Sequence, residues 1–588
     1  MKQLRNSLLL LLLLTPLFSL AQVTKQVEVT KAYVPQVERA TKHAIEPDMT
    51  DTVRMRPDID YTITPLSLQT TLTTTPIRPA QVTYWEFNRS KPLYLKLGAG
   101  YPTNSVADLY LSTQNPSTGY LMAYINHEGR YADRINDFDG KKYTAWQLEN
   151  RVGVAGGKYL GRRILEADIR YDNHWYHRFG AAPSSEYPVD LPNKEMDMDK
   201  PGSRLYFDEM SAQVRLGDDF LDLSRFNFEV VLHGGLFSGK PQCYRYDTAE
   251  QAYKPYNAST RQMMWGASAR IAKGFGRHHF SLSVGYDHLS GSKLLKGYRQ
   301  QQLRAGARYG VTGGVVKMDL GADLLCDWVK GVETQIYILP HLHLDFHLGT
   351  QGLRPFVEID GTARDNSFRS LSRLNPYVAN AYWSERSTVD YSGRLGIGGS
   401  LWKSIFTYRL YAQISVCDNN PYWYMDLAER GTLMPYLARQ TVTSLHGSIE
   451  LRPVSQLLVR LGVQGQFFGK SPKMPFKDKT FKLADGLSAL LADASVRYEG
   501  RKISFGVGVD MATSREYTLL DLQREGVPAA RLWKTPFAAN LKAHFDWHIS
   551  HRIGLFAEGE NLANCRLYTY PWYRDYGAMF TLGVKMKF

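Results

Sequence analysis

The last eleven residues of the chain alternate between apolar and polar side chains. Every second position of this segment is apolar: Ala578, Phe580, Leu582, Val584, Met586 and Phe588. Successive side chains of a β-strand point to opposite faces, so this pattern describes a strand with one apolar and one mostly polar face. The same period of two recurs in segments that begin at Leu457, Ile503 and Ala539. We therefore expect residues 91–588 to fold as an all-β domain.

The spacing of the turns separates a membrane barrel from a soluble β-sandwich or propeller. Tight connections are expected at 114–119, 159–163, 217–225, 273–277, 311–314, 349–354, 400–404, 452–455, 499–502 and 549–551. The connections between them are mostly much longer: 175–203, 237–259, 364–388, 417–437, 469–484, 514–534 and 565–576. Short turns at one end and long loops at the other are typical of outer-membrane barrels. The spacing predicts a closed transmembrane antiparallel barrel of about 22 strands, within a range of 18–24, with both termini periplasmic.

Composition excludes several other classes of protein. Of the 588 residues, 44% are hydrophobic and 12% aromatic, which excludes a disordered chain. Mean hydropathy is −0.34, and no stretch reaches ~18 consecutive apolar residues, so no membrane-spanning helix is expected. The net charge of +14 is spread along the chain without a long basic run. An anionic solute or an acidic membrane surface is therefore a better expected partner than nucleic acid.

Two segments precede the barrel region. Residues 1–21 combine a charged start, an apolar run and a small-residue end at Ser19-Leu20-Ala21, which predicts a secretory signal peptide. Residues 22–90 are rich in proline and threonine, which predicts an extended periplasmic tail. We expect this tail to be the segment that docks any periplasmic or outer-membrane protein partner.

The C-terminal stretch contains the pair Asn561-Leu562 and a last strand that ends in phenylalanine. These features resemble the end of TonB-dependent receptors, most closely those of the Bacteroidota. The resemblance implies a 22-stranded barrel and makes Phe580 and Phe588 a signal to the barrel-assembly machinery. It also lets the segment Val27, Glu28, Val29 and Thr30 be compared with a TonB box, although any extended tail can pair with a sheet edge. Residues 22–90 are too few and too proline-rich for the plug domain of that family, which predicts a plug-less relative.

Three histidines share one face of a predicted strand: His341, His343 and His347. The leucines between them belong to the lipid-facing row, so the imidazoles are expected to face the lumen. Imidazoles two residues apart on a strand can share a metal ion, which makes these histidines a candidate metal site. The alternative is that short polar side chains line a wet wall, as they do on every strand of such a barrel. No other cofactor is predicted.

No catalytic motif is present: the chain has no G-x-S-x-G elbow and no H-E-x-x-H pair, so it is not expected to be an enzyme. One function that remains is a pore or transporter for small solutes in the outer membrane of a Gram-negative cell. Lumen bases such as Arg460 and Lys542 would favour anionic solutes. The alternative is a non-transporting, accessory barrel of an outer-membrane complex, which docks partners through its tail and long outer loops. In both cases the surroundings are outer-membrane lipid and lipopolysaccharide.

Overall fold

The computed structural model describes residues 92–115, 118–135, 140, 142–180, 204–240, 242–247, 252–257, 259–348, 352–426, 431–521 and 529–588. The predicted signal peptide, the tail and its TonB-box-like residues Val27, Glu28, Val29 and Thr30 lie outside this range. No helix in the described part is long and apolar enough to span a membrane.

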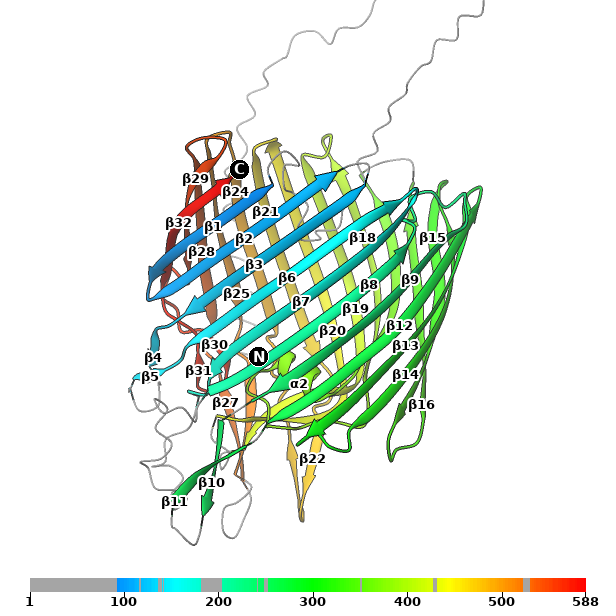
Figure 1. The fold of residues 1–588 in the computed structure, drawn as a ribbon. Helices are drawn as coiled ribbons and strands as arrows, with labels where there is room; N and C mark the ends of the chain where they lie inside the picture. The colour runs from blue at the N-terminus through cyan, green and yellow to red at the C-terminus, as the bar shows by residue number, and fades with distance from the viewer. Residues whose placement is uncertain are drawn as a thin grey trace, which may run out of the picture. The chain divides into compact units, whose positions relative to one another are not determined.

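Twenty-two strands form a closed antiparallel ring (Figure 1), which confirms the predicted all-β barrel and its strand count. In order around the ring, the strands are β1 (Leu93–Tyr101), β2 (Asn104–Asn115), β3 (Gly119–Arg130), β6 (Gln147–Leu160), β7 (Arg163–His177), β8 (Arg204–Gly217), β9 (Asn227–Gly239), β12 (Thr260–Phe275), β13 (His278–Lys293), β14 (Arg299–Val311), β15 (Val316–Val329), β16 (Gln335–Phe346), β17 (Arg354–Arg364), β18 (Thr388–Leu401), β19 (Phe406–Asp426), β20 (Leu433–Val454), β21 (Leu457–Phe468), β24 (Leu490–Glu499), β25 (Ile503–Ala512), β28 (Ala538–His548), β29 (Ile553–Glu560) and β32 (Met579–Lys587).

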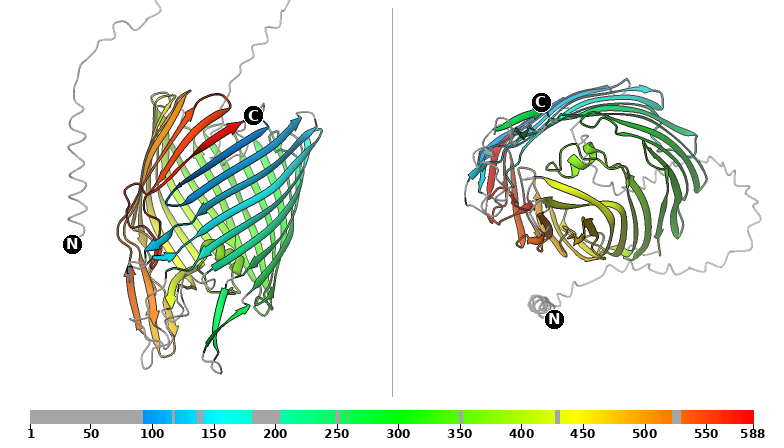
Figure 2. Two further views of the ribbon diagram at one scale, coloured as in Figure 1. Left: turned by 60° about the vertical axis from the view of Figure 1, so that its left-hand side comes forward. Right: turned by 90° about the horizontal axis from the view of Figure 1, so that it is seen from below.

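The ring closes where the first and last strands pair. Strand β32 lies antiparallel to β1, from Tyr94↔Lys587 to Tyr101↔Phe580, and Figure 2 (left) shows the two strands side by side. Beyond the last strand, the backbone N–H of Phe588 donates to the carbonyl of Leu93 at 2.9 Å. The closed ring leaves no unpaired edge strand, as a barrel in lipid requires.

The connections sort to two ends, as predicted from the sequence. All ten expected tight turns lie at the end that carries Leu93 and Lys587, which we name the turn end. The opposite loop end carries the longer connections and their local elements: β4 (Asp133–Ile135), β5 (Lys142–Thr144), β10 (Gln242–Asp247), β11 (Ala252–Asn257), α2 (Phe368–Leu374), β22 (Lys473–Phe476), β23 (Lys479–Lys482), β26 (Glu516–Asp521), β27 (Ala529–Lys534), β30 (Tyr568–Tyr570) and β31 (Tyr573–Arg574).

The loop end also shows where the sequence prediction was wrong. The predicted long loop at 417–437 is mostly strand, because β19 and β20 stay paired out to Met425 and Leu433, and only 427–432 connects them. Three further connections at this end are short, at 102–103, 294–298 and 330–334. An antiparallel pair needs only about two residues to turn, so a hairpin at the loop end can be as tight as one at the turn end.

The outward face of the barrel is apolar and the inward face polar. Ile338, Leu395 and Leu582 each remain 65% exposed on the outward face, and the two predicted signal residues, Phe580 and Phe588, are 50% and 46% exposed. Exposed aliphatic and aromatic side chains recur on strand after strand around the ring, far beyond what a soluble protein shows to water. The alternation read from the sequence therefore points its apolar rows outward, as a barrel in lipid does.

The largest buried cluster lies at the loop end. It joins inward-facing residues of β8 and β9 to residues of α2, of the start of β20 and of the connection between β29 and β32. Seen along the barrel, α2 lies inside the ring of strands (Figure 2, right). The core of this molecule is thus concentrated where one connection folds inward, and that connection defines the first part of the candidate site.

Candidate functional site: the mouth and the inner wall

Residues 365–387, which connect β17 to β18, fold into the ring at the loop end, and we name them the mouth segment. Its helix α2 begins at an N-cap, where the Ser367 side chain accepts a hydrogen bond from the backbone N–H of Ser370 at 3.3 Å. The helix ends at Leu374 because Pro376 follows and disfavours a helical conformation at the residue before it. The result is a short helix with Phe368 and Leu371 on its buried side.

One side of the mouth segment is bound to β8 and β9. Two nitrogens of Arg369 donate to one carboxylate oxygen of Glu209, at 3.1 Å and 2.6 Å, and Arg373 donates to the other oxygen at 2.5 Å. The side chain of Glu209 is only 5% exposed. Phe368 packs against both Phe207 and Phe237, with ring centroids 6.4 Å and 6.1 Å away. Burial, with the nearby Arg369 charge, lowers the pKa of Arg373, and the Glu209 carboxylate opposes this shift.

The other side of the mouth segment contacts β20 and the connection between β29 and β32. Backbone hydrogen bonds of 2.9 Å join Ala379 N to Leu433 O and Leu433 N to Tyr377 O. The Tyr377 ring stacks on Tyr573 with 3.7 Å between centroids, and the Tyr570 hydroxyl donates to a carbonyl of α2 at 3.2 Å. Burial raises the pKa of Tyr377 and of Tyr573 well above the usual value, so both phenols stay neutral. The segment therefore bridges separate arcs of the ring.

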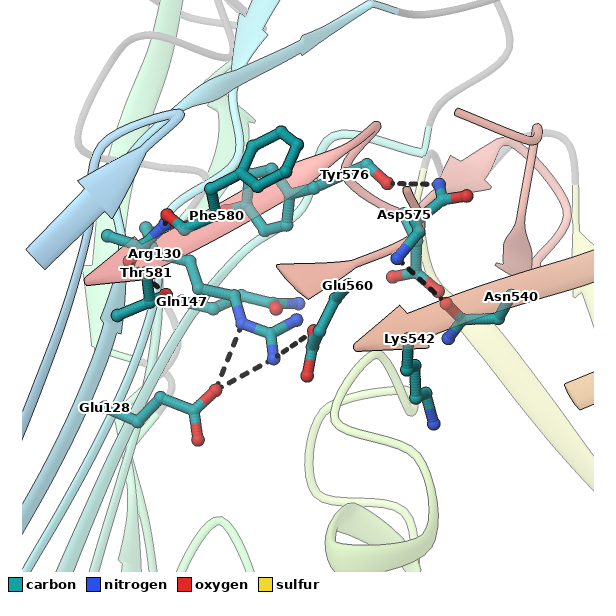
Figure 3. A network of polar contacts seen from close by, with 12 residues as sticks. Glu128, Arg130, Gln147, Asn540, Lys542, Glu560, Asp575, Tyr576, Phe580 and Thr581 are labelled. Carbon is teal, nitrogen blue, oxygen red and sulfur yellow. Dashed lines mark hydrogen bonds and ion pairs between the residues drawn. The ribbon is translucent and has the colours of Figure 1, made fainter. Parts of the chain in front are cut away.

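A polar cavity of about 360 Å³ opens on the inner wall formed by β1, β2, β3, β6, β7, β29 and β32, and we name it the wall cavity. Six carboxylates and three lysine or arginine side chains line it, so the cavity carries a net negative charge. Figure 3 shows Arg130 held between Glu128, at 2.8 Å, and Glu560, at 3.3 Å. Lys96 likewise lies 2.9 Å from Glu558. The bases of this cavity are thus held by carboxylates.

The two predicted lumen bases lie on the inner wall, and both are paired. Lys542 lies 2.7 Å from Asp510 on the neighbouring strand, and Arg460 lies 3.0 Å from Glu450. Partial exposure of all four side chains makes these pairs weak, but each base still has a carboxylate beside it. A passing anion would therefore find neither base free.

The structure brings two of the three predicted metal-binding histidines together. On the inner face, His341 and His343 contact Asp360 of β17, at 2.9 Å from Nδ1 and 3.0 Å from Nε2 respectively. His347 follows the end of β16 and is exposed. Four residues of strand cover about 13 Å, which is too far for His347 to share an ion with His343. Asp360 is the group that the sequence pattern missed, because only the pairing register places it opposite His341.

The Asn-Leu pair of the C-terminal resemblance has a local structural role. Asn561 has φ 48° and is 3% exposed. Its side chain donates to the carbonyls of Cys565 and Tyr576 and accepts from the Cys565 N–H, each at 2.9 Å. Asparagine tolerates this left-handed conformation better than most residues. Asn561 is therefore the first residue of the connection between β29 and β32, and its side chain holds that connection together. The connection packs against the mouth segment.

Comparison with known proteins yields structures but no sequence family. No protein-family model matches the chain. No curated protein matches its sequence either.

Solved structures of similar fold include the siderophore receptor PirA from Acinetobacter baumannii, with 8% identity over 84% of this chain and 80% of that chain and a TM-score of 0.63. They also include the ferric-catecholate import receptor Fiu from E. coli K12, with 11% identity over 85% and 82% and a TM-score of 0.60. A third is the FrpB iron transporter from Neisseria meningitidis, with 11% identity over 84% and 81% and a TM-score of 0.62. At such low identity the likeness concerns the fold, and it agrees with the 22-stranded barrel that the C-terminal resemblance implied.

Proposed function

We propose that this chain is an outer-membrane transport barrel, which passes small solutes through its lumen. The observation that carries the proposal is a closed 22-strand ring with an apolar outer face and a polar inner wall that contains cavities. The three similar structures are a siderophore receptor, a ferric-catecholate import receptor and an iron transporter, which supports the same class of function. In this proposal the turn end faces the periplasm, and the outer face contacts membrane lipid and lipopolysaccharide.

The relation to TonB-dependent receptors is part of the proposal. The chain would be a plug-less relative, with residues 22–90 as a periplasmic tail and Val27, Glu28, Val29 and Thr30 as a TonB-box-like segment. The mouth segment supports this, because a barrel without a plug needs another element to restrict its lumen. Its contacts with β8, β9 and β20 hold it at the loop end, which in this proposal is the entrance for solutes.

The net charge of the chain and the lining of the inner wall bear on the charge of the solute in different ways. An anionic solute stays a prediction, supported by the net charge of +14. The two lumen bases Lys542 and Arg460 support an anionic solute less, because each is paired with a carboxylate. The six carboxylates and three bases of the wall cavity favour cations on that side of the lumen.

Conductance in planar bilayers tests the transport function and the solute charge together. We expect current through the purified full-length barrel, and more current when Glu209→Gln and Phe368→Ala loosen the mouth segment. The sign of the reversal potential in a potassium chloride gradient reports whether cations or anions pass. Absence of current in both forms, with no swelling of liposomes in small sugars, would contradict transport.

The mouth segment also favours the alternative, a non-transporting barrel that docks partners. It fills part of the loop end with a packed aromatic cluster, as a rigid docking face would. Affinity purification from native membranes separates the two functions. Partners that disappear when residues 23–80 are deleted, from a barrel that carries no current, would support the docking role.

A further inference from the structure

We propose that His341, His343 and Asp360 form a binding site for a divalent first-row transition metal on the lumen wall. One donor atom from each side chain lies within 4.8 Å of the other two. No other group of three such residues in the described part of the chain meets this distance. Metal binding here needs no transport activity, so its test is separate from the conductance measurement.

The position of the three side chains follows from the strand register. His341 and His343 are alternate residues of β16, so both imidazoles point inward, with ring centroids 4.3 Å apart. Strand β17 pairs with β16 so that Asp360 stands directly opposite His341. One carboxylate oxygen therefore lies between the two rings, 2.9 Å from His341 Nδ1 and 3.0 Å from His343 Nε2.

These distances suit a shared ion. Zinc binds histidine nitrogen and carboxylate oxygen at about 2.0–2.2 Å, so neighbouring ligand atoms around it lie roughly 3 Å or slightly more apart. The two imidazole–carboxylate separations, 2.9 Å and 3.0 Å, are close to that spacing, and the two imidazole nitrogens lie within 4.8 Å of each other. An ion would replace the two hydrogen bonds with small side-chain shifts. Two imidazoles and one carboxylate suit zinc, copper, nickel or iron better than magnesium or calcium, which prefer oxygen alone.

Among the described residues, Asp360 forms ion pairs with the two histidines and with no lysine or arginine. Its neighbour Glu358 on the same strand is paired with Arg394 at 3.1 Å and Arg409 at 2.7 Å. The Asp360 carboxylate is therefore not neutralised by a lysine or arginine, and its charge is available to a cation.

A second carboxylate stands behind the cluster. If His341 binds the ion through Nδ1, its Nε2 faces Asp319 Oδ2 at 3.9 Å, so a side-chain shift of about 1 Å would join them in a hydrogen bond. The other oxygen of Asp319 is buried and has no hydrogen-bond partner among the described residues. A carboxylate behind a ligating imidazole orients the ring and raises its basicity.

The cluster is open to the lumen. The side chains of His341, Asp360 and His343 are 17%, 26% and 39% exposed. Three protein ligands leave at least one coordination position for water, as in exchangeable metal sites and unlike closed structural ones. The ion would therefore be bound from the lumen and released to it.

Isothermal titration with zinc chloride tests the site on the full-length barrel, purified in detergent through a tag that contains no histidine. We expect one zinc ion per wild-type chain, and an affinity at least about tenfold lower for His343→Gln and for Asp360→Asn. His347→Gln is the matched control on the same segment. His233→Gln is a second control, because His233 contacts a single carboxylate, Asp287, at 2.7 Å. Both controls should bind zinc as the wild type does.

Electron paramagnetic resonance of bound Cu²⁺ counts the nitrogen ligands, so it distinguishes the loss of one ligand from misfolding of the variant. The wild-type spectrum should show two nitrogen ligands, and that of His343→Gln should show one, in barrels whose heat-modified mobility on gels proves them folded. Zinc binding that is undetectable in the wild type, or unchanged in both ligand variants, would overturn the proposal. So would a copper spectrum without two histidine nitrogens.

Discussion

Arg369 of the mouth segment donates two hydrogen bonds to one carboxylate oxygen of Glu209 on β8, at 3.1 Å and 2.6 Å. The two residues are 160 positions apart in the chain, and the contact ties an inward-folded connection to the barrel wall. Because Glu209 also pairs with Arg373, one nearly buried carboxylate holds two cations of the same short helix. Substituting Glu209 therefore tests directly what holds the mouth segment against the barrel wall.

Replacing Glu209 with glutamine should release the mouth segment. Removing one partner from a fully buried ion pair costs about 3–5 kcal/mol, and less is expected here because Arg369 and Arg373 are 18% and 49% exposed. Backbone amides of 368–374 should therefore exchange hydrogen at least about 10-fold faster in Glu209→Gln. Asp418→Asn is the control, because its pair with Arg439 is largely exposed. Unchanged exchange in the Glu209 variant would show that the aromatic and backbone contacts hold the segment without the ion pairs.

The stacking of Tyr377 on Tyr573 can be separated from its hydroxyl. Tyr377→Phe keeps the ring, and among the described residues the hydroxyl has a single long contact, 3.5 Å from Gln147, so little change is expected. Tyr377→Ala removes a ring that is 3% exposed and should loosen the segment by about 3–5 kcal/mol. Protease cleavage within 365–387 measures the difference. Equal cleavage of the two variants would contradict a role for the ring.

Asn561 should stabilise the barrel through both its backbone and its side chain. Asn561→Gly keeps the left-handed conformation and loses three side-chain hydrogen bonds, at roughly 1 kcal/mol each. Asn561→Ala loses the same bonds and adds about 1–2 kcal/mol of backbone strain. The unfolding temperature on heat-modifiability gels should fall in the order wild type, Gly, Ala. An alanine variant as stable as the glycine variant would exclude the backbone contribution.

Phe588 should matter more for assembly than for the finished barrel. Phe588→Ala is expected to lower the amount of folded barrel in cell membranes severalfold, while Phe588→Tyr retains it. Phe505→Ala is the control, because Phe505 is a similarly exposed outward aromatic away from the chain end. If Phe505→Ala lowers the amount equally, loss of lipid-facing surface explains the effect and the terminal signal does not.

Much of the barrel could be predicted from the sequence because its rules are local. Period-two alternation places Phe580 and Leu582 outward whatever the neighbouring strand is, and the turn residues mark where each strand ends. The ten tight turns, the 22 strands and the inward position of His341 and His343 follow from such patterns. The lengths of the connections at the loop end did not, because how far a strand continues there depends on its pairing with the next strand, as for β19 and β20, and not on its own alternation.

The site required distances that only the folded ring provides. Asp360 joins His341 because two strands pair in one register, and a shift of one residue would turn its side chain to the lipid. Glu209 meets Arg369 because residues 365–387 fold inward, which no periodic pattern in a connection encodes. The sequence by itself thus determined which face of each strand meets lipid, since that depends on neighbours along the chain. The tertiary structure alone decided which inward side chains meet, since that depends on ring closure and strand register.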